Sequence, residues 1–303
     1  MCRVRKNIQG ELFSLNADRI VARNIDPIEK KPMYHFLPGS RSFSIAAMGC
    51  NFSCRFCQNH SISMVNEESA ILGDKMSPEQ LVALALKNRT QSISYTYTEP
   101  TVFFELVLET SRLAHAAGIK NVLVSNGYMT PQALALLGPF LDGANIDLKS
   151  FNDGFYKKYC SARLQPVLQT ISAMKAMGIW VEVTTLLIPG LNDDRLEIDG
   201  LLSFLCDLGA EIPWHASRFF PNYRLLDVPP TATGAIHDFL QLAAEKGLKF
   251  PYGGNMADSQ WSNTRCPQCR QTLIERSGYR IANPGLEQGR CRFCGETIPG
   301  IWQ

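Results

Sequence analysis

The chain has 303 residues, of which 45% are hydrophobic and 19% are charged, and its formal net charge at pH 7 is +2. Such a composition is typical of a globular protein with a substantial core, and it shows neither a basic patch for nucleic acid nor an acidic tail. No run of 18 or more apolar residues occurs, so we expect no membrane span. The start, MCRVRKNIQGELF, lacks the apolar stretch and cleavage site of a secretory signal, so we expect a cytoplasmic protein.

Most of the ten cysteines are set in close groups that long cysteine-free stretches separate. This grouping predicts metal ligation in a reducing compartment rather than a disulfide framework. Cys160 and Cys206 stand alone, and we interpret them as small buried side chains.

From residue 42 onward, strand-like and helix-like segments alternate. Helices are expected at 77–88, 99–118, 130–138, 165–178, 194–209 and 233–247, and strands at 42–48, 92–98, 119–127, 143–150, 179–190 and near 212–219. This order is typical of a parallel sheet whose crossovers are helices. Six or seven such units predict an α/β fold in which the sheet forms a closed or partly closed barrel.

Three segments follow from this pattern. Residues 1–41 are expected to be a lead-in that packs on the barrel, and residues 42–258 the barrel itself. Residues 259–303 lose the alternation and contain two CxxC pairs, which predicts a small C-terminal metal module. In a parallel sheet the strand C-terminal ends carry the site, so the candidate loops are 49–60, 97–101, 125–128, 147–151, 187–193 and 217–223.

The first of these loops contains three cysteines at C-x3-C-x2-C spacing: Cys50, Cys54 and Cys57. Three thiolates can hold three irons of a 4Fe–4S cube and leave the fourth iron open to a ligand. A zinc site completed by His60, three residues after Cys57, is the alternative.

The pattern C-x3-C-x-aromatic-C, here Cys50, Cys54, Phe56 and Cys57, resembles that of the radical S-adenosylmethionine (SAM) enzymes. The resemblance implies a (β/α)6-type partial barrel and a 4Fe–4S cluster whose open iron binds SAM. It also implies that reduction cleaves SAM to methionine and a 5′-deoxyadenosyl radical, which abstracts a hydrogen atom.

The resemblance covers residues 42 to about 255 and supplies expected SAM contacts. TYTEP (96–100) stands where many members have Gly-Gly-Glu-Pro, with Tyr97 and Thr98 in place of the glycines. SNG (125–127) and DLKS (147–150) are similar to strand-end segments of the pyruvate formate-lyase activating enzymes, which activate glycyl-radical enzymes. The expected cofactor contacts are Phe56, Cys57, Gln58, Thr98, Glu99, Asn126, Asp147, Leu148 and Lys149.

Two positions depart from the activases. Thr184 stands where they carry an Arg, and Pro221-Asn222-Tyr223 replaces their Pro-Tyr-His. The segments TYTEP, VTTLLIPGLND, PWHASRFFPNY and the terminal cysteine module look more like the AmmeMemoRadiSam-system radical SAM enzyme. That resemblance implies Memo-like and AMMECR-like partner proteins, beside a flavodoxin- or ferredoxin-like electron donor.

Four further polar residues are candidates for substrate contact or catalysis: Glu182, His215, Arg218 and Tyr223. A hydrogen-bonded structural cluster at the strand end is the alternative for the last three. Glu182, inside a β-branched strand, needs a partner if it points into the barrel.

The second metal site is predicted from Cys266-x2-Cys269 and Cys291-x2-Cys294. Four thiolates can close a tetrahedron around zinc, and a module of about 40 residues has too little core to fold without such a staple. Zinc in a ribbon-like module is our first interpretation, with rubredoxin-like iron or a second cluster as alternatives.

The sequence thus predicts a radical SAM enzyme acting on an unidentified substrate, with a 4Fe–4S cluster, SAM and structural zinc. A glycyl-radical-enzyme activase is the alternative within the class. A non-catalytic binding module stapled by two zinc ions is the alternative outside it.

Overall fold

One eight-stranded sheet organises the fold, and the computed structural model describes residues 2–66, 68–256 and 260–303. Its order is β12-β11-β10-β9-β8-β7-β5-β4, and all neighbours from β5 to β12 are parallel. The antiparallel edge strand β4 pairs with β5. The strands are β4 (Ala22–Pro27), β5 (Arg41–Ala46), β7 (Ser92–Tyr95), β8 (Lys120–Ser125), β9 (Gly143–Asp147), β10 (Trp180–Leu187), β11 (Trp214–Arg218) and β12 (Pro251–Gly254).

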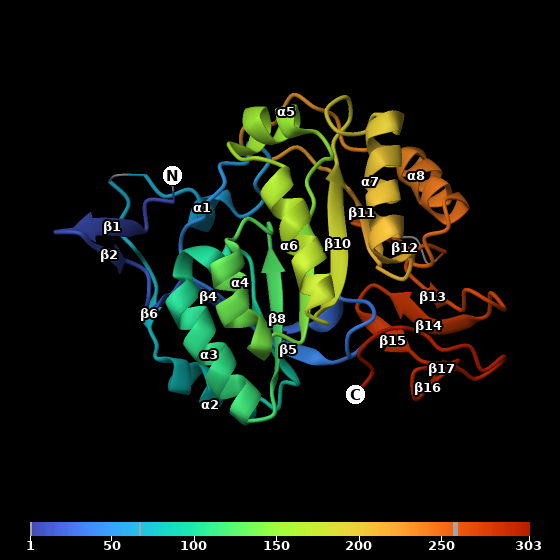
Figure 1. Cartoon of the computed structure of the whole chain (residues 1–303), viewed down its shortest axis with the longest axis horizontal. Helices are drawn as coiled ribbons and strands as arrows, with labels where there is room; N and C mark the ends of the chain where they lie inside the picture. Colours follow the sequence, from blue (N-terminus) through green and yellow to red (C-terminus); the bar gives the residue numbers. More distant parts are fainter. Residues whose placement is uncertain (1, 67, 257–259) are drawn as a thin grey trace.

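Helices connect the parallel strands, and Figure 1 shows several of them in front of the sheet. They are α2 (Pro78–Lys87), α3 (Phe104–Ala116), α4 (Pro131–Leu137), α6 (Gln165–Ala176), α7 (Arg195–Gly209) and α8 (Thr233–Glu245). Short helical turns lie at α1 (His60–Ser63), η1 (Ile28–Lys30), η2 (Pro100–Phe103), η3 (Gly138–Phe140), α5 (Asp153–Phe155) and η4 (Tyr156–Cys160).

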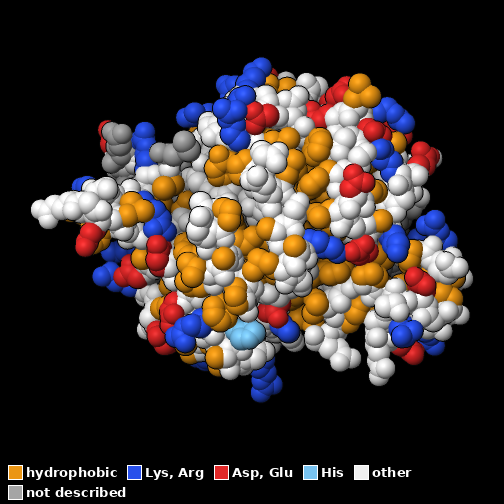
Figure 2. Space-filling model, in the orientation of Figure 1, with side chains coloured by type: hydrophobic (Ala, Val, Ile, Leu, Met, Phe, Trp, Pro, Cys, Tyr) orange, Lys and Arg blue, Asp and Glu red, His pale blue; other side chains and the backbone are white. Residues whose placement is uncertain are grey.

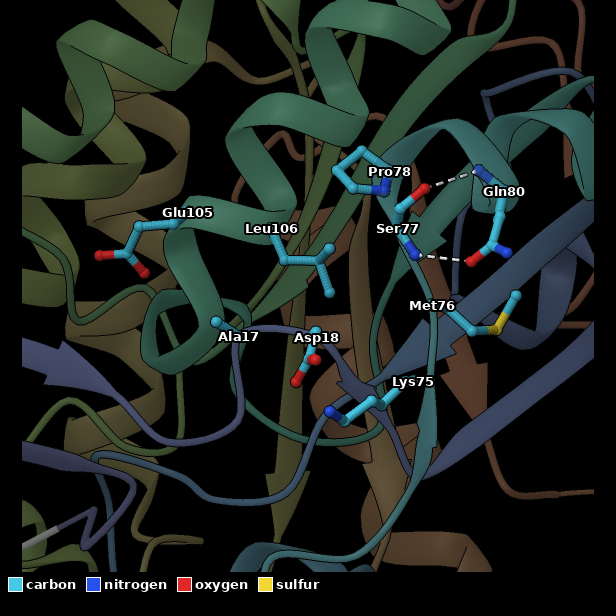
Figure 3. Close-up of a pocket in the computed structure, with 9 residues that line it drawn as sticks. All are labelled: Ala17, Asp18, Lys75, Met76, Ser77, Pro78, Gln80, Glu105 and Leu106. Carbon is cyan, nitrogen blue, oxygen red and sulfur yellow. Dashed lines mark hydrogen bonds between the residues drawn. The ribbon is translucent and has the colours of Figure 1, made fainter.

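The predicted helices are found, the one expected at 99–118 as the short turn η2 followed by α3, and signals in the sequence mark several of their ends. The Ser77 hydroxyl accepts from the Gln80 backbone N–H and the Gln80 side chain accepts from Ser77, a reciprocal cap that Figure 3 draws. Gly118 and Gly178 follow α3 and α6 with φ of +74° and +79°, a conformation that other residues rarely adopt.

The sheet does not close. Its strands follow chain order as in a (β/α) barrel, but β12 and β4 remain two separate edges among the described residues. The predicted α/β fold is confirmed, with an open curved arrangement of mostly parallel strands in place of a closed barrel. Figure 2 shows acidic and basic side chains interspersed over one face, in keeping with a net charge near zero.

The two faces of the sheet differ in polarity. Side chains such as Ile93 and Tyr95 point toward the helices and belong to the main core cluster. The alternating positions, such as Asn145 and Thr184, face the other side and bond to each other (Thr184 Oγ1 to Asn145 Oδ1, 2.9 Å). Because side chains alternate along a strand, this polar row lines the concave interior.

The lead-in fills the lower part of that interior. Met33 and Phe36 pack against Val122, and the Asn145 amide donates to the Pro32 carbonyl at 2.8 Å. The C-terminal tail joins it, because the Leu37 N–H donates to the Ile301 carbonyl at 2.7 Å.

Glu182 anchors the lead-in to the sheet. Its carboxylate is fully buried and accepts hydrogen bonds from the backbone N–H groups of Tyr34 (2.9 Å) and His35 (2.8 Å). His215 Nε2 lies 2.7 Å from the same carboxylate. Burial by itself raises the pKa of Glu182, but the bonds to His215 and the nearby His35 lower it below its usual value.

Two small sheets lie apart from the main one near the N-terminus. A hairpin of β1 (Arg5–Ile8) and β2 (Glu11–Ser14) projects at one end of the molecule in Figure 1. It is tied to α3 by the Arg5–Glu105 ion pair at 2.6 Å. Strand β3 (Arg19–Ile20) pairs with β6 (Asp74–Lys75).

The C-terminal module has its own small core of Cys266, Leu273, Ile274 and Cys291, which meets Phe250 and Tyr252 of the main body. Its strands are β13 (Thr264–Arg265), β14 (Thr272–Ser277), β15 (Arg280–Ala282), β16 (Leu286–Glu287) and β17 (Arg290–Cys291). The predicted boundary between residues 258 and 259 lies outside the described residues. No helix in the described parts of the chain is long and apolar enough to cross a membrane.

Replacing Glu182 with Ala should lower the free energy of unfolding by about 3–5 kcal/mol, because it leaves two buried N–H groups and His215 without their acceptor. Chemical denaturation followed by circular dichroism measures this. Glu211→Ala is the matched control, since that half-exposed Glu211–Lys175 pair should be worth about 1 kcal/mol or less. A Glu182→Ala loss no larger than that of the control would contradict the anchoring role.

His35 gives a pH dependence. It is fully buried, and burial lowers its pKa to about 4. In the unfolded chain its pKa is about 6.5. Between about pH 4 and pH 6.5 His35 is therefore protonated in the unfolded chain and neutral in the folded chain. The free energy of unfolding should therefore fall as pH drops from about 6.5 to 4, by on the order of 3 kcal/mol. Denaturation at several pH values checks this, and His35→Gln should lack that portion of the slope.

Candidate functional site

A cavity of about 570 Å³ lies where the C-terminal ends of the parallel strands converge. Its lining comes from the expected strand-end loops, and Lys30, Lys31 and Pro32 of the lead-in close one side. The cavity has the size of a small-molecule site. The expected cofactor contacts that line it are Phe56, Cys57, Gln58, Thr98, Glu99, Asn126, Asp147 and Lys149. Leu148 is not among the lining residues and packs in the main core.

The cysteine loop is fastened to the body on both sides. The Ser53 N–H donates to the Cys160 carbonyl and the Arg55 N–H to the Tyr159 carbonyl, both at 2.9 Å. These acceptors belong to η4, a π-helical turn that the sequence analysis did not predict. At the loop entrance Gly49 has φ +107°, and a Cβ there would stand 2.9 Å from Val4.

All three loop thiols, those of Cys50, Cys54 and Cys57, line this one cavity. They are not all within 4.8 Å of one another, whereas the only described group that meets this criterion is the C-terminal one. A single tetrahedral ion with bonds of about 2.3 Å needs closer sulfurs than that. The donor set therefore fits a multinuclear iron–sulfur cluster better than one zinc ion.

Polar groups already point at these sulfurs. The Phe52 N–H lies 3.3 Å from Cys50 Sγ, and the Asn126 amide nitrogen lies 3.7 Å from it. Burial raises the pKa of Cys50 and of Cys57. A hydrogen bond with the Cys160 thiol, and then burial, raises the pKa of Cys54. Since a metal binds thiolate, loading this site must displace protons.

His60, the alternative fourth ligand, lies outside the cavity lining. Its Nδ1 is 3.3 Å from the Cys57 carbonyl and its ring stacks on Tyr223 with centroids 4.6 Å apart.

Glu99 organises the neighbouring strand ends. Its carboxylate accepts from the Ser125 hydroxyl (2.8 Å), the Asn126 N–H (2.9 Å) and the Thr101 N–H (3.1 Å). Burial raises the pKa of Glu99. Glu99 thereby fixes Asn126, whose amide bridges to Asn51 of the cysteine loop at 2.7 Å.

A charged cluster at the mouth of the cavity was missed by the sequence analysis. Asp26 pairs with Lys30 (2.9 Å) and Lys31 (2.6 Å) and accepts from the Tyr97 hydroxyl. Burial lowers the pKa of Lys31 to about 8. Tyr97 adopts φ +65°, the left-handed conformation that favours glycine, the residue that the Gly-Gly-Glu-Pro resemblance implies here.

Asp147 and Lys149 form an ion pair of 2.8 Å on the opposite wall. Burial acts to lower the pKa of Lys149, but Asp147 and the Cys54 thiolate raise it above its usual value. Lys149 therefore stays charged, and together the two side chains offer a cation and an acceptor to a zwitterionic ligand.

The four candidate catalytic residues do not gather in this cavity. Glu182 is the buried anchor described above, and His215 faces a neighbouring cavity. Arg218 donates to the Thr231 carbonyl at 2.8 Å. Tyr223 stacks on His60, with φ +53°.

The Radical SAM superfamily pattern matches residues 45–202, which span β5 to α7. An uncharacterized protein of Methanocaldococcus jannaschii is 44% identical over 300 residues, covering 98% of this chain and 89% of the relative. The chain belongs to the radical SAM superfamily.

Other relatives are more distant. The isethionate sulfite-lyase activating enzyme of Nitratidesulfovibrio vulgaris is 27% identical over 122 residues, covering 39% of this chain and 40% of that enzyme. A radical SAM methyltransferase structure from Sphaerobacter thermophilus has a TM-score of 0.57 at 16% identity, covering 72% of this chain and 67% of that one, and shares the fold. Superfamily membership supports an enzyme and implies SAM and an iron–sulfur cluster as its cofactors.

The second cysteine group is compact. Cys266 Sγ lies 3.6 Å from Cys294 Sγ, Cys269 Sγ lies 3.6 Å from Cys291 Sγ, and all four sulfurs are within 4.8 Å of one another. Burial opposes ionisation of Cys291, but the backbone N–H groups of Cys294 and Phe293 help to lower its pKa to about 7. The four thiols can bind one tetrahedral metal ion.

A separate depression of about 590 Å³ lies between β6, α2 and α3, far from any cysteine of these groups. Figure 3 shows its side chains, among them Asp18, Lys75 and Glu105. The polar network of the depression is the α2 cap, and its Glu105 is paired with Arg5. We therefore interpret the depression as a structural contact between these elements.

Replacing Cys269 with Ser should lower metal binding by the C-terminal module and the midpoint of thermal unfolding, because it removes one of four clustered thiols beside a core of few residues. Elemental analysis after purification and differential scanning calorimetry measure both effects. Cys206→Ser, whose thiol bonds only to the Lys246 carbonyl among its described contacts, is the control and should keep the metal. A Cys269→Ser protein with full metal content would contradict the assignment.

Proposed function

We propose that the protein is a radical SAM enzyme that reductively cleaves SAM at a 4Fe–4S cluster held by Cys50, Cys54 and Cys57. The bound cofactors supply a 5′-deoxyadenosyl radical for hydrogen abstraction from a substrate. The observation that carries the proposal is the convergence of three thiols, one buried and two partly buried and spaced too widely for one ion, on one cavity of small-molecule size.

The chain's own residues divide the remaining work. Asn126 and the Phe52 N–H donate toward the Cys50 sulfur and stabilise its thiolate. The Asp147 carboxylate complements the amino group of SAM, and the Lys149 ammonium complements its carboxylate. Phe56 and Gln58 line the same cavity. Thr98 holds the loop through its hydroxyl bond to the Ala47 carbonyl at 2.6 Å, and Lys31 with Tyr97 shields the mouth from water.

The activase alternative has one observation in its favour, the partial similarity to the activating enzyme of Nitratidesulfovibrio vulgaris. Thr184 stands where the activases carry an Arg, and its hydroxyl donates to the Asn145 side chain. The lack of a long cationic side chain at this position favours a small-molecule reaction. A glycyl radical signal in electron paramagnetic resonance, on a partner enzyme treated with this protein, would decide for the activase. We also propose Memo-like and AMMECR-like partner proteins, as the AmmeMemoRadiSam resemblance implies. The proposed electron donor is a flavodoxin- or ferredoxin-like protein.

For the C-terminal module we propose zinc. Its sulfur separations of 3.6 Å match a tetrahedron with bonds of about 2.3 Å, and its four thiols leave no open position. Anaerobically purified protein should therefore contain about four irons with matching sulfide and one zinc. Two zincs without sulfide would instead support the non-catalytic module.

Cys50→Ala, Cys54→Ala and Cys57→Ala should each abolish formation of 5′-deoxyadenosine from SAM and a strong reductant after anaerobic reconstitution. Each change removes one thiolate that the cluster needs. Liquid chromatography with mass spectrometry measures the product, and absorbance near the visible cluster band reports loading. His60→Ala is the control and should keep both, because His60 lies outside the cavity. Continued product formation in a cysteine variant would refute the proposed function.

A further inference from the structure

The cysteine loop has an exposed outer face, although its three thiols line the cavity of the candidate site. Ser53 and Arg55 are exposed, whereas Cys54 and Phe56, which alternate with them, are buried and line the cavity. Consecutive Cα atoms, such as those of Cys54 and Arg55, are about 3.8 Å apart. A single layer of backbone therefore lies between the solvent and the inner side of the loop.

Exposed basic side chains surround this outer face. The Arg55 N–H donates to the Tyr159 carbonyl of η4, and the Arg55 carbonyl accepts from the Arg224 N–H, both at 2.9 Å. The loop thus lies directly between η4 and the segment that follows β11. These three neighbouring segments supply five exposed cations, which we call the basic rim: Arg55, Lys157, Lys158, Arg163 and Arg224. No run of basic residues marks the rim in the sequence, because its members come from segments far apart in the chain.

The basic rim carries more positive charge than its carboxylates offset. Asp153 pairs with two of the cations, Lys157 (2.8 Å) and Arg163 (3.0 Å). Asp227 lies exposed in the segment after β11, and the other three cations have no carboxylate partner among the described residues. Five cations and two carboxylates thus gather here in a chain whose formal net charge is only +2. Figure 2 shows basic side chains at the top of the molecule, in the region of α5.

Two cations of the basic rim are held against aromatic rings. Lys158 Nζ lies 5.1 Å from the centroid of the Tyr159 ring, and the Arg224 guanidinium carbon lies 5.0 Å from that of Tyr223. Tyr223 in turn stacks on His60, at the end of the cysteine loop, with centroids 4.6 Å apart. Such contacts restrict long side chains before a partner arrives, which lowers the entropy that binding would cost.

We propose that the basic rim is the docking surface of an acidic electron-carrier protein that reduces the cluster. The proposal rests on the proposed function, in which SAM occupies the cavity on the inner side of the loop, so that a protein reductant approaches from the outer side. Cleavage of a sulfonium to a thioether and a carbon radical takes up one electron. In the transfer the reduced carrier loses that electron and the cluster gains it, and no covalent bond forms or breaks. Opposite charges on the two surfaces accelerate the encounter and orient it.

A nucleic acid is the other anionic occupant that a basic surface can take. The carboxylates of the basic rim count against it, since phosphates crossing the rim would approach Asp153 and Asp227 closely. A protein can instead place its own lysines and arginines opposite these two side chains.

Biolayer interferometry with a flavodoxin of net negative charge tests the docking surface on the reconstituted protein. The association rate constant should fall steeply between about 50 and 300 mM NaCl, because salt screens exposed charges. Lys158→Glu with Arg224→Glu should lower this rate constant about tenfold or more at low salt, and the corresponding Gln pair should lower it less. Lys87→Glu with Arg89→Glu is the matched control. These two cations are exposed, lie at the N-terminal edge of the sheet before β7, and should leave the rate constant unchanged.

Formation of 5′-deoxyadenosine separates docking from the proposed function. With a strong chemical reductant the wild type and both Glu pairs should form it equally, which also shows that the variants fold. With reduced flavodoxin only the Lys158→Glu, Arg224→Glu protein should lose rate. The proposal is overturned if flavodoxin does not bind the wild type, if the rim pair and the control pair bind it alike, or if the rim pair loses affinity for a transfer RNA probe but not for flavodoxin. Absence of product with the chemical reductant would contradict the proposed function, while the binding measurement still decides on docking.

Discussion

The fold depends on one buried carboxylate. Glu182 sits inside the concave face of the sheet, where an unpaired charge would be prohibitive, and it is satisfied by two backbone N–H groups of the lead-in and by His215. That bond set fixes residues 34 and 35 inside the sheet and thereby the whole stretch from Lys30 to Phe36. The bonds to Glu182 thereby also position the cavity floor, the cluster around Lys31 and the Tyr34 ring under Arg276.

A parallel sheet usually buries apolar residues on both faces, and here one face is polar. Asn145, Thr184 and His215 stand on it, and Val122 on the same face packs against the lead-in. The polar row makes the concave side a binding surface once the lead-in has closed its lower end. The sheet can therefore stay open. A closed barrel would pair β5 with β12, but here β4 pairs with β5 and the C-terminal module packs beside β12.

The sequence predicted the elements whose signals are local. The helix ranges and the two CxxC pairs of the C-terminal module depend on neighbours a few residues away, and the structure has them close to where they are expected. Contacts over long separations left no such signal. Cys160 meets Cys54 across 106 positions, and Arg276 meets Tyr34 across 242. The bonds from Glu182 to the Tyr34 and His35 N–H groups are of this long-range kind, and for Arg218 the bond to the Thr231 carbonyl supports the structural alternative that the sequence left open.

The two cysteine groups differ in how closely their sulfurs approach and in what surrounds them. In the module, two CxxC turns face each other, and the four sulfurs close on one point with backbone N–H groups behind them. At residues 50–57 three thiols line one cavity, and no fourth cysteine is among the described residues that line it. Cys160, the nearest extra thiol, bonds to Cys54 and is fully buried in the core, so it cannot fill that position while it holds the loop. The turn η4 thus fixes the cysteine loop through its backbone carbonyls and at the same time keeps the Cys160 thiol out of the cavity lining.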